Sequence, residues 1–369
     1  MLNTLVDAQR LACPTCRRVD EHGFHEHPLA VGEVAVSEGE HIVQGLLTCP
    51  GCGTGYPVID GVAIIFTDVA SWLRQQERDV FGRSDLAEPV ASWLRTAWDD
   101  DAPPNSDRSM LATYGRALAP PPAPLSPLHG LLQQEAEAAR DYLEARRKAL
   151  VTWHGGSPTV LDAGCSVGAT SLAWARAGAR VVAMDHVFGP LRVLAQLLRR
   201  GRAVVPRWRH GGYDYVDEVV SVDTEGLAIA PIASDVANPP LRAQQLDIVA
   251  AYHLLDNLPD PVLFLRQAHG MLVPGGTLVS SSPYEWVSRI TPRTERIGAS
   301  IRSDPAAEPD AAPALRELLT GALPHVAPEL AFQLGEERLH LPWVLQRHDR
   351  SFHVFTTHYL EAHRGGPAD

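Results

Sequence analysis

From residue 158 onward, short apolar runs typical of buried strands alternate with patterns of helical period. Such alternation with short connections predicts an α/β fold whose mostly parallel sheet is covered on both faces. The expected strands cover 159–162, 180–185, 227–235, 246–252 and 276–282, and the expected helices cover 170–177, 190–200 and 261–271.

The N-terminal part has a different pattern. Residues 1–67 are dominated by turns and short strands, and an Asp60-Gly61 turn between two apolar runs predicts a hairpin. Residues 68–100 are expected to be mainly helical, prolines at 103–104 and 120–124 interrupt any helix, and 131–153 has an amphipathic helical pattern. We therefore expect a small domain over 1–67, a helical and proline-rich connecting region over 68–150, and a larger domain over 151–369.

The length of the chain bears on the number of domains, and its net charge bears on the class of partner. A chain of 369 residues exceeds the roughly 250–300 residues at which single cores stop growing. A net charge of −12 makes nucleic acid an unlikely partner, and the arginines between 192 and 209 are interpreted as a solvated helix face and loop. The start carries no secretory signal, and no apolar run reaches about 18 residues, so we expect a cytoplasmic chain without membrane spans. The oligomeric state is left unknown.

A nucleotide site is predicted where the first strand of the larger domain meets its first helix. Asp162 precedes a turn containing Gly164 and Gly168, and glycines let the backbone approach a ligand beside the free N–H groups of a helix start. Asp185 ends the next strand, where an acid can bind ribose hydroxyls, and Asp235 ends the third, where it can meet an adenine amino group. A plain turn and a dinucleotide site are the alternatives.

Together with the turn Pro274-Gly275-Gly276 before the fifth strand, these positions resemble the class I methyltransferases that use S-adenosylmethionine (SAM). The resemblance covers about 158–285, and departs from the family at Ser166, where a middle glycine is usual. It implies a Rossmann-like sheet and a turn that faces the methionine end of SAM. The residues that it assigns to the cofactor are Asp162, Gly164, Cys165, Gly168, Asp185, His186, Asp235 and Val236.

Candidates for the methyl acceptor site follow the fourth and fifth strands, whose carboxyl ends border the same crevice. They are Tyr252, His253 and Tyr284, and His253 is a candidate base at neutral pH. Alternatively, His253 and Asp256 only cap the next helix. The loop at 211–215 is either a cover for the substrate or an ordinary surface loop.

A narrower resemblance involves residues 253–261, 281–286, 291–293 and 341–348. They are similar to the C-terminal methyltransferase domain of ovothiol biosynthesis enzymes, a similarity that spans roughly 158–365. The resemblance implies methyl transfer to an imidazole nitrogen of a thiol-bearing histidine. The sulfoxide synthase domain of those enzymes has no counterpart in this sequence, so the acceptor can differ.

Two Cys-x-x-Cys pairs, Cys13 with Cys16 and Cys49 with Cys52, predict a tetrahedral Zn²⁺ site in preference to a redox pair. Residues 10–66 also resemble the small zinc-ribbon protein that activates several tRNA, rRNA and release-factor methyltransferases as a separate subunit. Within 1–67, three arginines face eight acids, which argues against RNA binding by this segment.

The leading hypothesis is therefore a SAM-dependent methyltransferase that acts on a nitrogen of a small-molecule or peptide substrate, with a thiohistidine-like imidazole as the best guess. One alternative is an RNA or protein methyltransferase that docks its substrate through the zinc ribbon. Another is a non-catalytic scaffold with the same fold.

Overall fold

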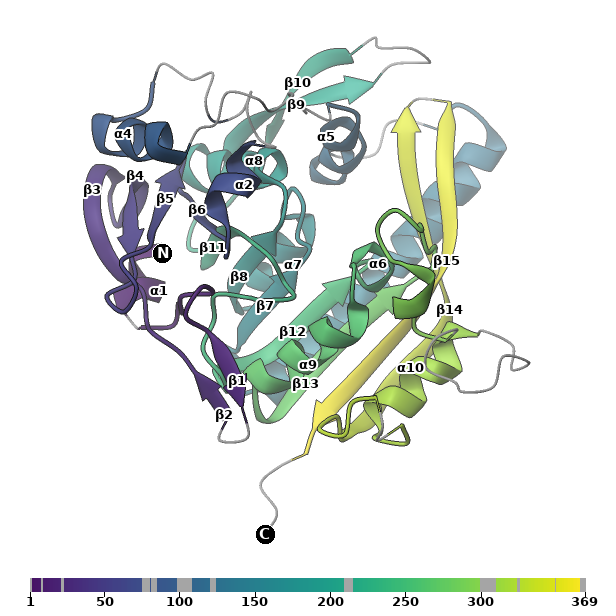
Figure 1. Ribbon diagram of the computed structural model, residues 1–369. Coiled ribbons are helices and arrows are strands. Elements are labelled where there is room, and N and C mark those ends of the chain that lie inside the picture. Colours follow the sequence, from purple (N-terminus) through teal and green to yellow (C-terminus); the bar gives the residue numbers. More distant parts are fainter. Residues whose placement is uncertain are drawn as a thin grey trace.

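The computed structural model describes residues 2–7, 9–20, 23–74, 80, 85–97, 108–119, 124–208, 215–298, 310–323, 326–348 and 350–365. These residues form one eleven-stranded mixed sheet and two separate two-stranded ribbons, with helices packed around the sheet (Figure 1). No helix in these ranges is both long enough and apolar enough to cross a membrane.

The described strands are β1 (Arg18–Asp20), β2 (Gly23–His25), β3 (Ala30–Glu38), β4 (His41–Thr48), β5 (Gly55–Ile59), β6 (Val62–Ile65), β7 (Thr159–Ala163), β8 (Arg180–Asp185), β9 (Arg202–Trp208), β10 (Tyr215–Ser221), β11 (Ile229–Ser234), β12 (Leu246–Tyr252), β13 (Leu272–Ser282), β14 (Phe332–His348) and β15 (Ser351–Arg364). The described helices are α1 (Leu2–Asp7), α2 (Val69–Arg74), α4 (Glu88–Ala97), α5 (Arg108–Gly115), α6 (Pro127–Trp153), α7 (Ala169–Arg176), α8 (Phe188–Arg200), α9 (Pro261–Met271) and α10 (Ala311–Leu319), with short 3-10 helices η1 (Arg116–Leu118), η2 (Leu255–Asn257) and η3 (Arg293–Glu295).

The centre of the sheet is parallel, in the order β11-β8-β7-β12-β13, and it confirms the predicted α/β fold. The residues of β7 and β11 are all buried, as expected for strands covered on both faces. The chain proceeds from β7 to β8 and β11 on one side, then returns to β12 and β13 on the other. The strand order therefore reverses between β7 and β12, which is where ligands bind in sheets of this kind.

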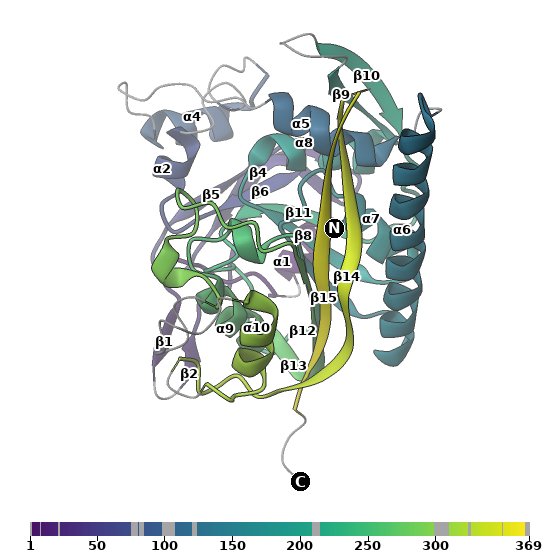
Figure 2. The ribbon, with the colours of Figure 1, turned by 90° about the vertical axis from the view of Figure 1, so that its right-hand side faces the viewer.

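Local signals set the helices that cover this sheet. The Asp260 side chain accepts a hydrogen bond from the Leu263 N–H and caps α9, whose first residue is Pro261. Gly201, with φ 65°, ends α8 in the left-handed conformation. Helices α6 and α7 lie on one face of the sheet, and α9 and α10 lie on the other (Figure 2).

The N-terminal segment continues the same sheet. Strand β6 pairs in parallel with β11, and β5, β4 and β3 follow it in antiparallel order. The predicted hairpin is present, with Asp60 and Gly61 at positive φ of 54° and 82° in its two-residue turn. The segment expected to be a small domain thus covers the β11 edge of the larger one, and the boundary at residue 67 stays a prediction.

Two hairpins were not predicted from the sequence. Strands β14 and β15 form a long hairpin, and β15 lies antiparallel beside β13. Strands β9 and β10 form a separate ribbon, and α5 packs against both β9 and β14 (Figure 1). Of the predicted 211–215 loop, residues 211–214 lie outside the described part of the chain.

Several of the arginines between 192 and 209 pair with acids. Arg192 lies 2.7 Å from Asp60, and Arg199 lies 3.7 Å from Glu38 on β3. Arg207 lies 3.8 Å from Glu218 on the neighbouring strand β10. The Arg199 side chain is only 6% exposed, so Arg192 and Arg199 join α8 to the N-terminal segment and do not form the solvated face that the sequence suggests.

Candidate active site

The glycine-rich turn joins β7 to α7 at the point where the strand order reverses. The N–H groups of Gly164 and Cys165 both donate to the Met184 carbonyl at the end of β8, 2.8 and 3.0 Å away. Gly164, Ser166 and Gly168 have positive φ values of 74°, 49° and 83°. A Cβ at Gly168 would lie 2.5 Å from Leu194, so close packing and backbone conformation both require glycine there.

Asp185 fixes this turn from the end of β8. Its carboxylate accepts one hydrogen bond from the Ser166 N–H at 2.8 Å and another from the Val187 N–H at 2.9 Å. Burial raises the pKa of Asp185, and these two hydrogen bonds act in the opposite sense. Each carboxylate oxygen keeps further acceptor capacity, so a ribose hydroxyl can be bound without displacing the turn.

Asp162 ends β7 and is 2% exposed. It accepts a hydrogen bond of 2.6 Å from the Ser171 hydroxyl on α7. Burial raises its pKa to about 7, although the Ser171 hydrogen bond and the positive charge of Arg147 lower it. The side chain thus joins the first strand to the first helix of the site and titrates near neutral pH.

The predicted site residues that follow β8 and β11 differ in their burial. His186 is exposed, and its ring meets Phe66 edge-on at 5.1 Å. Asp235 is exposed and accepts a hydrogen bond from the Ala237 N–H within its own loop, whereas Val236 is buried in the core. Asp162, Asp185 and Asp235 nevertheless lie at the carboxyl ends of three adjacent parallel strands, as the sequence predicts.

Tyr252 and His253 end β12 beside the glycine turn. The His253 ring stacks on Trp343 of β14, with ring centroids 3.6 Å apart and an interplanar angle of 4°. Burial lowers the pKa of His253 to about 3, so the imidazole is neutral at pH 7 and a weak base. Its role in the acceptor site stays a prediction.

Asp256 does not cap the following helix, because Asp260 does so. Instead, its carboxylate accepts hydrogen bonds from the Ser282 hydroxyl at 3.0 Å and the Glu285 N–H at 2.8 Å. Asp256 therefore ties the segment after β12 to the segment after β13. Tyr284 lies in this second segment, with φ 57° and its N–H donating to the Ser282 hydroxyl.

The four predicted metal ligands are brought together at the N-terminal end of the chain. The sulfurs of Cys13, Cys16, Cys49 and Cys52 all lie within 4.8 Å of one another. Cys13 and Cys52 are 3.7 Å apart, and Cys16 and Cys49 are 3.8 Å apart. A tetrahedron with Zn–S bonds of ~2.3 Å has edges of about 3.8 Å, so the sulfur spacing fits Zn²⁺.

The cysteine cluster is attached to the loop that follows β11. The Asn238 side-chain amide donates to the Pro14 carbonyl at 3.1 Å and to the Thr67 hydroxyl at 3.0 Å. The Ala12 N–H donates to the Pro240 carbonyl at 2.8 Å. The N-terminal segment thus holds the loop that begins at Asp235, on the predicted adenine side.

Sequence patterns missed several residues of this region because they come from distant segments without a motif. Arg147 of α6 is buried and lies near Tyr252 and Asp162, on whose pKa values its charge acts. Tyr114 of α5 lies close enough to Asp185 and Asp256 for both carboxylates to raise its pKa. Helix α5 therefore brings Tyr114 near two carboxylates of the candidate site, although its sequence suggests only a connecting region.

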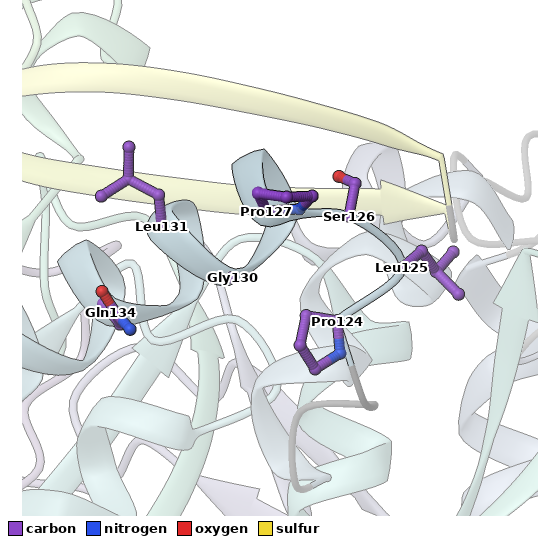
Figure 3. A pocket seen from close by; sticks show the side chains of 7 residues that line it. All are labelled: Pro124, Leu125, Ser126, Pro127, Gly130, Leu131 and Gln134. Carbon is purple, nitrogen blue, oxygen red and sulfur yellow. The ribbon is translucent and has the colours of Figure 1, made fainter.

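A surface hollow at the start of α6 lies apart from this site. It is bordered by Pro124, Leu125, Gly130 and Gln134, without any residue of the glycine turn (Figure 3). The residues around it offer no titratable side chain for chemistry, so we assign it no part in the candidate site.

The central strands lie in a part of the chain that is similar to known methyltransferases. The family described as "Methyltransferase domain" matches residues 161–280. Ubiquinone biosynthesis O-methyltransferase from Marinobacter nauticus is 33% identical over 122 residues, which are 33% of this chain and 42% of that protein. The protein of that name from Xanthomonas campestris is 30% identical over 159 residues, or 43% of this chain and 53% of that protein. This chain thus spans about half the length of the curated relatives it matches.

Among solved structures, magnesium protoporphyrin IX methyltransferase from Synechocystis with bound SAH is 15% identical and covers 69% of this chain and 93% of that one, with a TM-score of 0.39. Residues 161–280 match the methyltransferase domain family, and the parallel sheet with a glycine turn at its switch point has the architecture expected of such a domain.

Proposed function

We propose that the whole chain is a methyltransferase that transfers the methyl group of SAM to a small acceptor. The observation that carries this proposal is the glycine-rich turn between β7 and α7, pinned by Asp185 at the point where the strand order reverses. A glycine-rich turn at the start of a helix, with a carboxylate beside it that has acceptor capacity left, suits a nucleoside with a charged tail.

Polar atoms left without partners support a ligand at this place. Within the described part of the chain, the buried Ser166 and Tyr252 hydroxyls have no partner in hydrogen-bonding geometry, although Arg147 lies beside Tyr252 and acts on its pKa. Leaving such groups unpaired costs about 1–3 kcal/mol each, so a bound polar ligand is their natural partner. Ser166 lies in the turn and Tyr252 ends the neighbouring strand β12, which places both groups around the switch point.

The proposed cofactor contacts are those of the sequence analysis. Asp185 would bind the ribose, Asp235 would meet the adenine, and Gly164, Cys165 and Gly168 would border the methionine end. SAM supplies a methyl group on a sulfonium centre, which leaves with its bonding electrons on sulfur. The protein then has only to place the acceptor in line at roughly 3–3.5 Å and, for a protonated acceptor, to remove a proton.

The acceptor atom is the finer part of the proposal. The ovothiol-like segments favour an imidazole nitrogen of a thiohistidine, whereas the curated relatives are named O-methyltransferases. Tyr252, His253 and Tyr284 would shape the acceptor pocket in either case. An oxygen acceptor is therefore the alternative that the test must distinguish.

The test is methyl transfer from radiolabelled SAM to 5-thiohistidine and, in parallel, to a simple catechol. We expect label in the thiohistidine, and none when Asp185→Asn replaces the acid that pins the turn. Asp223→Asn is the matched control, because the exposed Asp223 carboxylate accepts the Glu225 N–H of its own turn, and the Asp223 carbonyl that accepts from Arg176 is unchanged in the variant. Label in the catechol alone would overturn the nitrogen acceptor, and no transfer to any small acceptor would contradict the proposal.

We further propose that the four cysteines bind one structural Zn²⁺ ion. The four sulfurs would fill every position of a tetrahedral shell, which would leave no open position for catalysis. The Cys13 sulfur also lies 3.0 Å from the Tyr56 hydroxyl, and the Cys52 sulfur lies 3.0 Å from the Thr54 hydroxyl. Such hydrogen bonds orient metal ligands. The ion would stabilise the contact with the loop after β11 and so act on cofactor binding only indirectly.

Metal analysis of the purified protein tests this proposal. We expect about one zinc per chain, lost in Cys49→Ser and retained in Cys165→Ser, whose thiol lies in the glycine turn. Removing the metal should lower the melting temperature and weaken SAM binding, because the loop at 235–243 loses its support. A metal-free protein with unchanged melting would show that the cysteines are not a structural zinc site.

A further inference from the structure

Three side chains that are distant in the sequence form a continuous hydrogen-bonded chain at the carboxyl end of β13. The Tyr284 hydroxyl lies 2.7 Å from Nδ1 of His358 on β15. Nε2 of the same histidine lies 2.8 Å from Oε1 of Glu337 on β14. The order Tyr–His–Glu has the geometry in which a carboxylate orients an imidazole and the imidazole accepts a proton from a hydroxyl.

The partners fix the direction of each hydrogen bond. A carboxylate can only accept, so Nε2 of His358 carries the proton and donates it to Glu337. Nδ1 is then unprotonated and accepts from the Tyr284 hydroxyl. Glu337 is itself held from the other side by Arg316 of α10, whose Nε lies 3.4 Å from the same oxygen.

Burial shows which member of the chain can meet a substrate. His358 is 4% exposed, whereas Tyr284 is only partly buried. Tyr284 also has φ 57°, a left-handed conformation that costs a tyrosine of order 1–3 kcal/mol. Its backbone is kept there by the Ser282 hydroxyl, which is bound in turn by Asp256. This strained segment follows β13, next to the strand whose end carries Tyr252 and His253.

We propose that Tyr284, His358 and Glu337 form a proton relay that deprotonates the methyl acceptor, an inference that rests on the proposed methyl transfer. The acceptor's proton passes to the Tyr284 oxygen as the tyrosine's own proton passes to His358 Nδ1. The lone pair freed on the acceptor forms the bond to the methyl carbon, and the electrons of the carbon–sulfur bond leave on sulfur. Glu337 stabilises the imidazolium, which then returns its proton to water through Tyr284.

His253 is the weaker candidate for this task. Burial lowers its pKa to about 3, and its ring contacts Trp343 and the Ser281 hydroxyl, with no carboxylate bonded to it among the described residues. The pKa of His358 is also lowered, mainly by burial, but the hydrogen bond and charge of Glu337 offset part of that effect. The other charged groups that act on His358 are Arg316 and Asp310 of the α10 side, and Tyr284 additionally faces Asp256.

The relay is tested first without turnover, by nitrogen NMR of the full chain labelled in histidine. The His358 signals are assigned by their loss in His358→Gln. We expect a neutral ring at pH 7 with the proton on Nε2. A proton on Nδ1 would overturn the relay, because that nitrogen could then not accept from Tyr284.

Steady-state kinetics supply the second test, with SAM and whichever of the two probes, 5-thiohistidine or the catechol, the protein methylates. Tyr284→Phe should lower kcat by about 10²–10⁴-fold with little change in KM. Glu337→Gln should lower kcat and move the acidic limb of the kcat/KM profile to lower pH, because the group that raises the pKa of His358 is gone. Glu336→Gln is the matched control, since this neighbouring acid is exposed and accepts from Tyr142 instead. An unchanged kcat in Tyr284→Phe, or an unmoved acidic limb in Glu337→Gln, would contradict the relay.

SAM binding separates this inference from the proposed function. Calorimetry should give wild type, Tyr284→Phe and Glu337→Gln the same SAM affinity within about twofold, because none of these changes touches the glycine turn. If wild type bound no SAM, the proposed function would fail, while the NMR result would still decide whether the hydrogen-bonded chain exists.

Discussion

Individual side chains at the switch point act on the fold and the site together. Asp185 was predicted to bind ribose, and in the structure its two oxygens already hold the backbone of the turn. Glycine spacing predicted where this turn lies, because backbone approach requires it. Spacing could not reveal Arg147 or His358, because only the packing of α6 and β15 brings them to the site. Residue-level prediction is therefore good for the turn and poor for its distant neighbours.

Asp162 makes stability depend on pH. Its pKa in the folded protein is about 7, above its ordinary value of 3.8, so the folded state binds the proton more tightly than the unfolded state. The protonated Asp162 therefore contributes to the free energy of unfolding. This contribution is fully present below about pH 4 and is lost as the pH rises to 7, at about 1.4 kcal/mol per pH unit.

Asp162→Asn, which stays neutral and can still accept from Ser171, should remove this dependence. Urea unfolding should measure this effect at pH 5 and pH 8. The free energy of unfolding of Asp162→Asn, relative to that of wild type, should be about 2–3 kcal/mol higher at pH 8 than at pH 5. Asp223→Asn, an exposed acid, should gain nothing. Equal pH dependence in wild type and Asp162→Asn would show that Asp162 is ionised throughout.

The elements of the central sheet follow their sequence patterns closely. The predicted strand at 180–185 coincides with β8, and the predicted helix at 261–271 coincides with α9, where Asp260 and Pro261 provide a clear start. The long hairpin β14–β15 was missed because its pairing contains several register shifts that disturb strict alternation. Pairing of β6 with β11 was missed for another reason, since local patterns do not specify which distant strand lies alongside.

Hydrogen exchange tests the joining of the N-terminal strands to the sheet. Strand β6 is completely buried between β5 and β11, so its bonded amides should exchange as slowly as those of β7. The exposed edge strand β3 serves as the internal comparison and should exchange faster. Slow exchange in β7 with rapid exchange in β6 would mean that residues 1–67 open as an independent unit.

At the scale of the whole molecule, the sheet edges explain how the parts work together. The N-terminal strands extend the sheet beyond β11 and bring the cysteine cluster to the loop after that strand. At the other edge, β14 and β15 bring Glu337, His358 and Trp343 beside the ends of β12 and β13. The proposed cofactor and acceptor sides are thus supported by opposite ends of one sheet.

The central claim is that the turn between β7 and α7 binds SAM, and calorimetric titration of the full chain with SAM tests it most directly. We predict saturable binding at one site per chain, weakened at least about tenfold in Asp185→Asn and unchanged in Asp223→Asn. Absence of binding by the folded wild-type protein, or equal affinity in Asp185→Asn, would contradict the account.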